Sequence, residues 1–153
     1  GSDSDFPVMQ ITLDVLKSFD IRYEVKVTSA HRTPAATHAY VTDAEARGCK
    51  VFICAAGLAA HLAGAVAGIT TRPVIGVPID GGPLKGMDAL LSTVQMPGGV
   101  PVATMSIGDS GAQNAGLYAL QTLSISDDDL ANRLAKFRED QKQAVIESSE
   151  ELD

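Results

Sequence analysis

A histidine and an arginine stand side by side in the stretch SAHR (29–32), which follows the alternating run IRYEVKV (21–27). An imidazole takes up and releases protons near neutral pH, so His31 is a candidate general acid and base. Arg32 carries a permanent charge and can grip a phosphate through two parallel N–H groups. Taken alone, such a pair in a polar turn is more often an ordinary surface feature. Whether it belongs to a ligand site therefore depends on the other segments that lie near it.

Two further segments have the composition that a ligand site needs. GSDSD (1–5) offers hydroxyls, carboxylates and backbone N–H groups that suit a phosphate, although Ser and Asp are also ordinary helix caps. AAGLAAH (55–61) contains Gly57, which lets a ligand approach the backbone, and His61. The alternative for this segment is a close-packed helix whose alanines face another helix.

Other kinds of catalytic site fit the sequence poorly. No serine stands in a G-x-S-x-G turn, which argues against a Ser-His-Asp hydrolase. No two histidines, and no cysteine with a histidine, have the spacing of metal ligands. The third histidine, His38, falls inside a predicted helix and is interpreted as a surface residue.

The candidate segments lie between elements that alternate along the chain. The predicted strands cover 21–27, 50–56, 72–79 and 100–107, and the predicted helices cover 6–18, 34–47, 59–68, 86–95 and 111–123. Asp5 and Thr33 are the predicted caps of the first two helices. Strand–helix repetition indicates an α/β fold, a three-layer αβα doubly wound (flavodoxin-like) parallel sheet. Ligands bind such sheets at the carboxyl ends of the strands, where all three candidate segments belong.

The two ends of the chain carry separate expectations. Ser126 and three aspartates predict the start of a charged helix over 127–149, which either packs on its own domain or reaches a neighbouring subunit. We therefore expect an α/β catalytic domain over 1–125 and a C-terminal helical extension over 126–153. Because a doubly wound sheet of this size has a central first strand, we also expect that strand upstream of residue 1.

Composition narrows the function further. The 153 residues are 45% apolar, which suits a globular protein, and no apolar run is long enough for a membrane span. Nine of the 19 acidic residues lie in 127–153, and without a basic stripe the chain suits a small phosphorylated ligand better than nucleic acid. Cys49 and Cys54 lack C-x-x-C spacing, so we expect reduced, buried thiols and a cytoplasmic protein.

Six motifs in the same order resemble the PurE family of purine biosynthesis. They are GSDSD, SAHRTP, AAGLAAHLAG, PVIGVP, LLSTVQMPGGVPVATMSIG and GAQNAGL, and the resemblance covers about residues 1–124. The residues within these motifs are similar to those of class I, the 5-(carboxyamino)imidazole ribonucleotide mutases. Class II members carboxylate aminoimidazole ribonucleotide directly with carbon dioxide; they tend to have lysine in place of Arg32 and lack VQMPGGVPVAT.

The resemblance implies a cofactor-free isomerase that binds no metal. The carboxylate would move from the exocyclic nitrogen to carbon 4 of the imidazole, by loss and recapture of a trapped carbon dioxide, with His31 as general acid and base. It also implies a homo-octamer in which the C-terminal helix reaches across subunits. The implied substrate-binding residues are Ser2, Ser4, Asp5, Ser29, Ala30, Arg32, Gly57, His61 and Leu62.

Departures and alternatives remain. Leu58 stands where many members have a second glycine, and Ala63 where many have proline, without loss of a chemical group. Direct carboxylation of aminoimidazole ribonucleotide is the alternative reaction. A non-catalytic phosphate- or flavin-binding module is the alternative of another class, and the scarcity of aromatic residues, 5%, disfavours a flavin.

Overall fold

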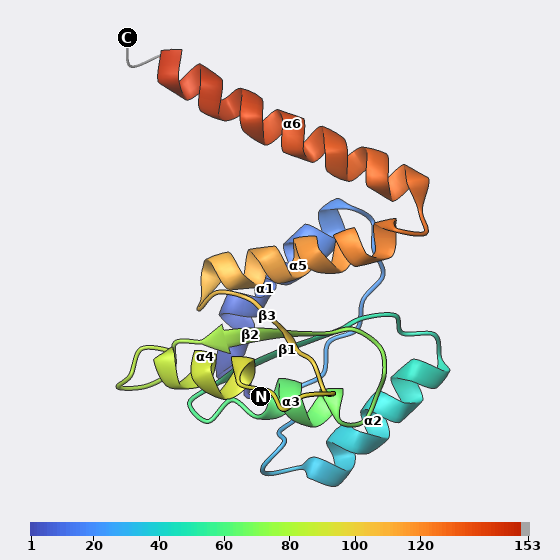
Figure 1. Ribbon diagram of the computed structural model, residues 1–153, viewed down its shortest axis with the longest axis vertical. Helices are drawn as coiled ribbons and strands as arrows, with labels where there is room; N and C mark the ends of the chain where they lie inside the picture. Colours follow the sequence, from blue (N-terminus) through green and yellow to red (C-terminus); the bar gives the residue numbers. More distant parts are fainter. Residues whose placement is uncertain (151–153) are drawn as a thin grey trace. The chain divides into compact units, whose positions relative to one another are not determined.

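A computed structural model describes residues 1–150 of the chain, and these alternate between helices and strands (Figure 1). The elements are η1 (Asp3–Asp5), α1 (Phe6–Ser18), α2 (Pro34–Ala46), β1 (Phe52–Gly57), α3 (Leu62–Ala67), β2 (Val74–Ile79), α4 (Met87–Val94), β3 (Ala103–Thr104), α5 (Asp109–Ser124) and α6 (Asp128–Glu150). Both α1 and α2 have a proline in the first turn, where the missing N–H breaks no hydrogen bond.

The three strands form one parallel sheet in the order β1-β2-β3. β1 and β2 pair along all of their residues, whereas β3 is paired at Ala103 and Thr104 only. All of β2 is buried, as its unbroken apolar run predicts for a strand covered on both faces. The strand predicted over 100–107 is therefore present but shorter than the apolar run around it.

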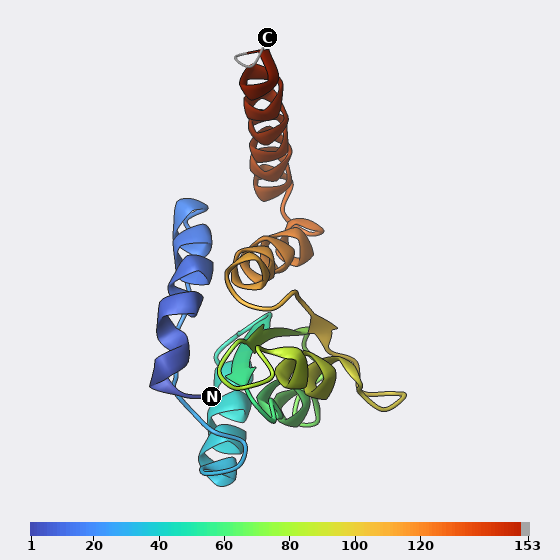
Figure 2. The same cartoon turned by 90° about the vertical axis from the view of Figure 1, so that its left-hand side faces the viewer.

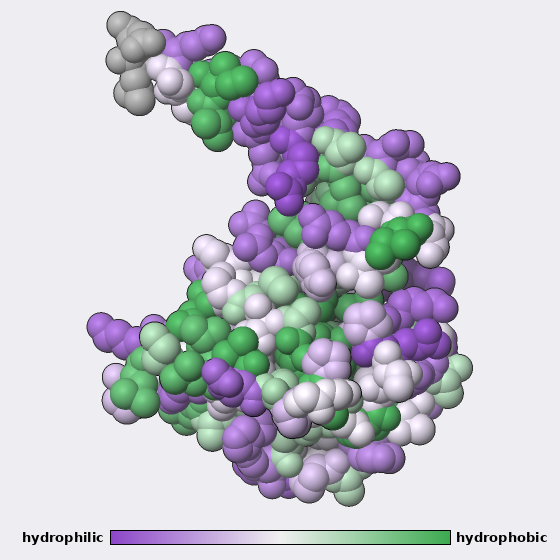
Figure 3. Space-filling model, viewed as in Figure 1, coloured by the Kyte–Doolittle hydropathy of each residue, from purple (hydrophilic) through white to green (hydrophobic). Residues whose placement is uncertain are grey.

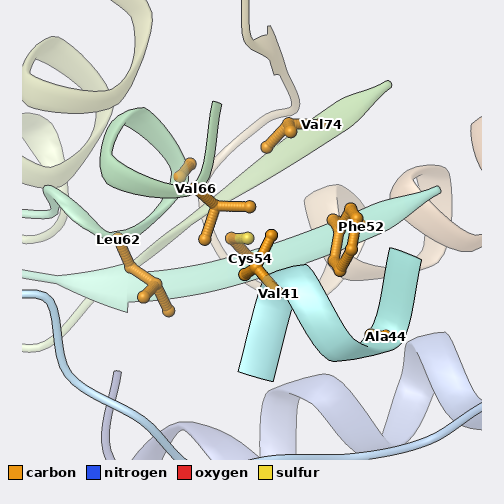
Figure 4. Packing of buried hydrophobic residues seen from close by; sticks show 8 residues of the cluster. Val41, Ala44, Phe52, Cys54, Leu62, Val66 and Val74 are labelled. Atoms are coloured by element: carbon orange, nitrogen blue, oxygen red, sulfur yellow. The ribbon is translucent and has the colours of Figure 1, made fainter. Parts of the chain in front are cut away.

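Helices cover the two faces of this sheet. On one face α2 and α3 pack on β1 and β2 (Figure 4) through Val41, Ala44, Leu62, Ala63, Val66, Phe52, Cys54 and Val74. On the other face α1 and the first part of α5 pack on the strands through Val8, Met9, Ile11, Ala112, Ala115, Ala119, Ala55, Ile75 and Val77. The three-layer, flavodoxin-like α/β architecture is thus confirmed.

Gly76 in β2 lets α4 approach the sheet closely. A Cβ atom at this position would lie 2.4 Å from the Thr93 side chain of α4 and 3.4 Å from Ala63 of α3. Thr93 is itself buried and donates a hydrogen bond to the Ala89 carbonyl oxygen at 2.7 Å. The absence of a side chain at Gly76 is therefore what allows α4 to pack at this point, whereas the distance to α3 is an ordinary van der Waals contact.

The predicted strand at 21–27 is wrong. These residues form an extended trace without strand pairing (Figure 2), and Tyr23, Val25 and Val27 are exposed. Alternation predicts an extended chain, but a strand also needs a hydrogen-bonding neighbour, and β2 is the only strand paired with β1 within residues 1–150. The segment is held to α2 instead, because the Arg47 guanidinium donates to both carboxylate oxygens of Glu24. These hydrogen bonds lower the pKa of Glu24.

Apolar side chains are also exposed on α4. Leu84, Met87, Leu91 and Val94 are each between 45% and 62% exposed, and Figure 3 shows hydrophobic atoms gathered over this helix.

Cys54 is fully enclosed, and burial raises the pKa of its thiol to about 12. Burial of both thiols was expected; Cys54 is buried, whereas Cys49 is only partly buried.

The chain divides into two compact units, Gly1–Ala119 and Leu120–Asp153. In the second unit, α6 begins where the Asp127 carboxylate accepts the N–H of Leu130 at 3.0 Å, so Asp127, and not Ser126, is the cap. No helix among residues 1–150 is long and apolar enough to span a membrane. The division falls inside α5, and the domain boundary at 125/126 and the intersubunit role of α6 stay predictions.

Candidate functional site

The SAHR segment is a turn closed by its own hydroxyl groups. The Ser29 Oγ accepts the N–H of Arg32 at 3.1 Å, and the Thr33 Oγ1 accepts the N–H of Ser29 at 3.0 Å. Thr33 thus caps the turn and makes no side-chain cap bond to α2, which corrects its predicted role. In this contact the Ser29 hydroxyl oxygen is the acceptor, so its O–H remains able to donate. His31 and Arg32 are both exposed to solvent.

A buried threonine ties this turn to the body of the domain. Thr37 in α2 is 2% exposed, and its hydroxyl lies 2.6 Å from the hydroxyl of Thr28. The same Thr37 hydroxyl donates to the Thr33 carbonyl oxygen at 3.0 Å. The position of the turn is therefore fixed by the first turn of α2.

The GSDSD segment folds around the carboxylate of Asp5, which is 8% exposed. One oxygen of this carboxylate accepts the N–H of Ser2 at 2.9 Å and a hydrogen bond from the Gly1 nitrogen at 3.1 Å. The Gly1 nitrogen also donates to the carbonyl oxygen of Ala55 in β1 at 2.6 Å. Asp5 was predicted to cap α1, but its side chain turns back and closes η1 in a capping box with Ser2.

The two segments border an open pocket of about 330 Å³. The Arg32 side chain bridges them, because its Nη2 donates to the Gly1 carbonyl oxygen at 3.3 Å and leaves most of its N–H groups unused by this contact. The pocket is lined by Gly1, Ser2, Asp3, Val27, Thr28, Ser29, Arg32 and Thr33. Three predicted site residues, Ser2, Ser29 and Arg32, are therefore brought together, and Arg32 is the only cationic side chain among the lining residues.

His31 and His61 meet beside this turn. The Nε2 of His31 lies 2.6 Å from the Nδ1 of His61, with ring centroids 4.7 Å apart and planes inclined at 71°. His61 precedes α3, and the loop before it is held to α4 because the Ser92 Oγ accepts the N–H of Ala60 at 2.9 Å. Two loops predicted to meet at one sheet edge therefore do so through their histidines.

The remaining predicted residues have different surroundings. The Leu62 side chain is 8% exposed and points into the core (Figure 4), so it supports the loop from behind. Ala30 packs partly on the same core, and Ser4 is exposed with its hydroxyl 2.9 Å from that of Ser2. Gly57 ends β1, where a Cβ atom would lie 3.3 Å from the carbonyl oxygen of Ile79.

Sequence reasoning did not single out the other lining residues of the pocket. Asp3 lies inside the GSDSD motif, and its carboxylate accepts the N–H of Ser4 at 3.1 Å. Val27 ends the segment predicted as a strand and Thr28 directly follows it, and neither was considered as part of a ligand site. The signal available was their position directly before Ser29 at the predicted carboxyl end of the strand.

Comparison with known proteins places this chain in a family. The model of the AIR carboxylase family matches residues 1–144. The chain belongs to the AIR carboxylase family. The N5-carboxyaminoimidazole ribonucleotide mutase of Bacillus subtilis is 56% identical over 152 residues, which are 99% of this chain and 94% of that protein.

Other members are similar over nearly the whole chain. The N5-carboxyaminoimidazole ribonucleotide mutase of Pyrococcus abyssi is 54% identical over 93% of this chain and 80% of that protein. The chloroplastic phosphoribosylaminoimidazole carboxylase of Vigna aconitifolia is 46% identical over this whole chain but only 27% of that longer protein. The crystal structure of Treponema denticola PurE superposes with a TM-score of 0.91 at 28% identity and covers 100% of this chain and 94% of that one.

Proposed function

We propose that this member of the AIR carboxylase family is a mutase that acts on 5-(carboxyamino)imidazole ribonucleotide in purine biosynthesis. It moves the carboxylate from the exocyclic nitrogen to carbon 4 of the imidazole, which gives 4-carboxy-5-aminoimidazole ribonucleotide. The observation that carries the proposal is the SAHR turn, where Arg32 lines the pocket and His31, the residue before it, contacts His61. The identity of 56% with a protein named as this mutase supports the same reaction.

The pocket suits the phosphate end of a ribonucleotide. Its volume of about 330 Å³ lies at the lower end of the usual range for small-molecule sites. The Arg32 guanidinium and the hydroxyls of Ser2 and Ser29 supply a cation and O–H donors, which a phosphate requires. The Oδ2 of Asp5 already accepts from Ser2 and Gly1, so in this proposal the ribose hydroxyls bind its other carboxylate oxygen, and Ser4 belongs to the same loop.

His31 supplies the proton chemistry. The bond between the carboxylate carbon and the exocyclic nitrogen breaks, its electron pair stays on nitrogen, and the His31 imidazolium protonates that nitrogen. Carbon 4 then attacks the carbon dioxide, and neutral His31 removes the proton from carbon 4, which restores the imidazolium. One side chain serves both steps because the two proton transfers run in opposite directions, and such transfers contribute roughly 100- to 10,000-fold in rate.

Retention of the carbon dioxide completes the proposal. We propose that Ala30, Gly57 and the backbone before His61 give the carbon dioxide a small, uncharged surface, and that the bound substrate excludes water and so keeps the carbon dioxide from hydration. We further propose a cytoplasmic homo-octamer in which α6 packs on a neighbouring subunit. The exposed apolar side chains of Val145 and Ile146 on α6 are consistent with such a contact, which sedimentation measures directly.

The two candidate reactions are separated by their substrates. We expect the purified protein to convert 5-(carboxyamino)imidazole ribonucleotide without added bicarbonate. Turnover that requires bicarbonate and aminoimidazole ribonucleotide, and that ignores the carbamate substrate, would instead establish direct carboxylation. A flavin absorbance in the purified protein would point to the non-catalytic alternative.

A further inference from the structure

The Nε2 atom of His31 is already engaged by a side chain of the protein. It lies 2.6 Å from the His61 Nδ1, and a hydrogen bond of this length needs one proton between the two nitrogens. Either His31 donates from Nε2 to His61, or His61 donates from Nδ1 to His31. The two arrangements leave His31 with different nitrogens for chemistry, because the bond at one ring nitrogen sets the protonation of the other.

The proposed reaction selects between these arrangements. His31 must release a proton and later take one up at the same nitrogen. If that nitrogen were Nε2, the contact with His61 would have to break and re-form in every cycle. If it is Nδ1, the Nε2–H stays in place in both the imidazolium and the neutral ring, and the bond to His61 persists throughout.

We propose that His61 is a positioning residue whose Nδ1 accepts the Nε2–H of His31 and so makes the His31 Nδ1 the nitrogen that transfers the proton. The inference rests on the proposed function of His31. His61 then needs its own proton on Nε2 and acts as a neutral acceptor. It fixes the tautomer and ring orientation of His31 in the way that a hydrogen-bonded partner orients a catalytic histidine in other enzymes.

The support behind His61 suits a fixed acceptor. The N–H of Ala60, one residue earlier, donates to the Ser92 Oγ at 2.9 Å, and the Ser92 hydroxyl donates to the Asp88 carbonyl oxygen at 2.7 Å. One residue later, the Leu62 side chain is buried in the core. The backbone on both sides of His61 is therefore anchored, while its ring remains exposed next to His31.

Two substitutions separate hydrogen bonding from shape. In His61→Asn the amide oxygen stands on Cγ, as Nδ1 does in histidine, and can accept the same N–H. In His61→Leu the side chain fills similar space and accepts nothing. We expect His61→Leu to lower kcat by about tenfold or more, a part of the 100- to 10,000-fold that proton transfer supplies, with KM within twofold of the wild type. We expect His61→Asn to retain kcat within about threefold.

The controls make each outcome decisive. His38→Leu changes an exposed histidine on α2 and should leave kcat unchanged, and thermal unfolding verifies that each variant is folded. His61→Ala replaces His61→Leu if the leucine variant does not fold, with the same expected loss. The assignment would be overturned by full activity of His61→Leu or His61→Ala. It would also be overturned if His61→Asn lost as much activity as these variants, or if the loss were confined to KM. Failure of the wild type to turn over the carbamate substrate would instead overturn the proposed function.

Discussion

Arg32 is the side chain whose removal should separate substrate binding from chemistry. It is the only cationic side chain among the residues that line the pocket, and Asp3 lines the same pocket with a negative charge. Arg32→Ala therefore leaves a phosphate facing hydroxyls and a carboxylate. Because a phosphate contact of this kind is made in the substrate complex and in the transition state alike, its loss should raise KM and leave kcat nearly unchanged.

The magnitude follows from the exposure of the guanidinium. Hydrogen bonds to charged groups contribute about 1.5–3 kcal/mol, and solvent and salt screen an exposed pair toward the lower half of that range. A loss of about 1.5–2 kcal/mol corresponds to an increase in KM of about 10- to 30-fold, since 1.4 kcal/mol is a factor of ten. Arg32→Lys keeps the charge but loses the paired N–H geometry, so we expect an intermediate KM.

The assay is steady-state conversion of 5-(carboxyamino)imidazole ribonucleotide at several ionic strengths. Arg22→Ala is the matched control, because Arg22 is exposed in the extended segment and does not line the pocket. We expect the control to keep the KM of the wild type. A loss in Arg32→Ala that is confined to kcat at saturating substrate would refute the assignment of Arg32 to the phosphate.

Three further substitutions test the chemistry and the packing. His31→Asn should lower kcat by about 100- to 10,000-fold without changing the melting temperature, because His31 is exposed; near-normal turnover would move the proton role elsewhere. Gly76→Ala should lower the free energy of unfolding by about 1–3 kcal/mol, because the new Cβ clashes with Thr93. Gly98→Ala is the control and should not lower it, because no atom lies within 4 Å of the new Cβ. Equal urea midpoints for the two variants would contradict this prediction. Burial raises the Cys54 pKa from about 9 to about 12, so between these pH values the folded state holds a proton that the unfolded chain loses. The free energy of unfolding should therefore fall more steeply with rising pH in the wild type than in Cys54→Ala. Urea unfolding at pH 8 and pH 10 measures this, and an equal fall in the two proteins would contradict it.

Local signals explain how much of the fold the sequence predicts. First-turn prolines at Pro7 and Pro34 and the unbroken apolar run of β2 are each contained in a few residues, and all three were read correctly. The run at 21–27 has the right alternation but lacks a paired neighbour in the described sheet. Pairing is a relation between distant segments, and no pattern within one segment reports it.

The site shows the same limit. The doubly wound pattern correctly predicted that the loops holding Ser2, Ser29 and Arg32 share one sheet edge. It did not predict that Asp5 would close its own loop in place of capping α1. Nor did it predict the contact between His31 and His61, which are 30 residues apart and meet only because two loops turn toward each other.

The most direct measurement of the central claim follows the carboxylate itself. Unlabelled 5-(carboxyamino)imidazole ribonucleotide is converted in a medium that contains ¹³C-bicarbonate, and the product is examined by mass spectrometry within the first few per cent of turnover. We expect the product carboxylate to be unlabelled, because in the proposed mechanism the carbon dioxide released beside His31 is recaptured before it escapes. A product that carries the label of the medium from the first turnovers would contradict an enclosed transfer.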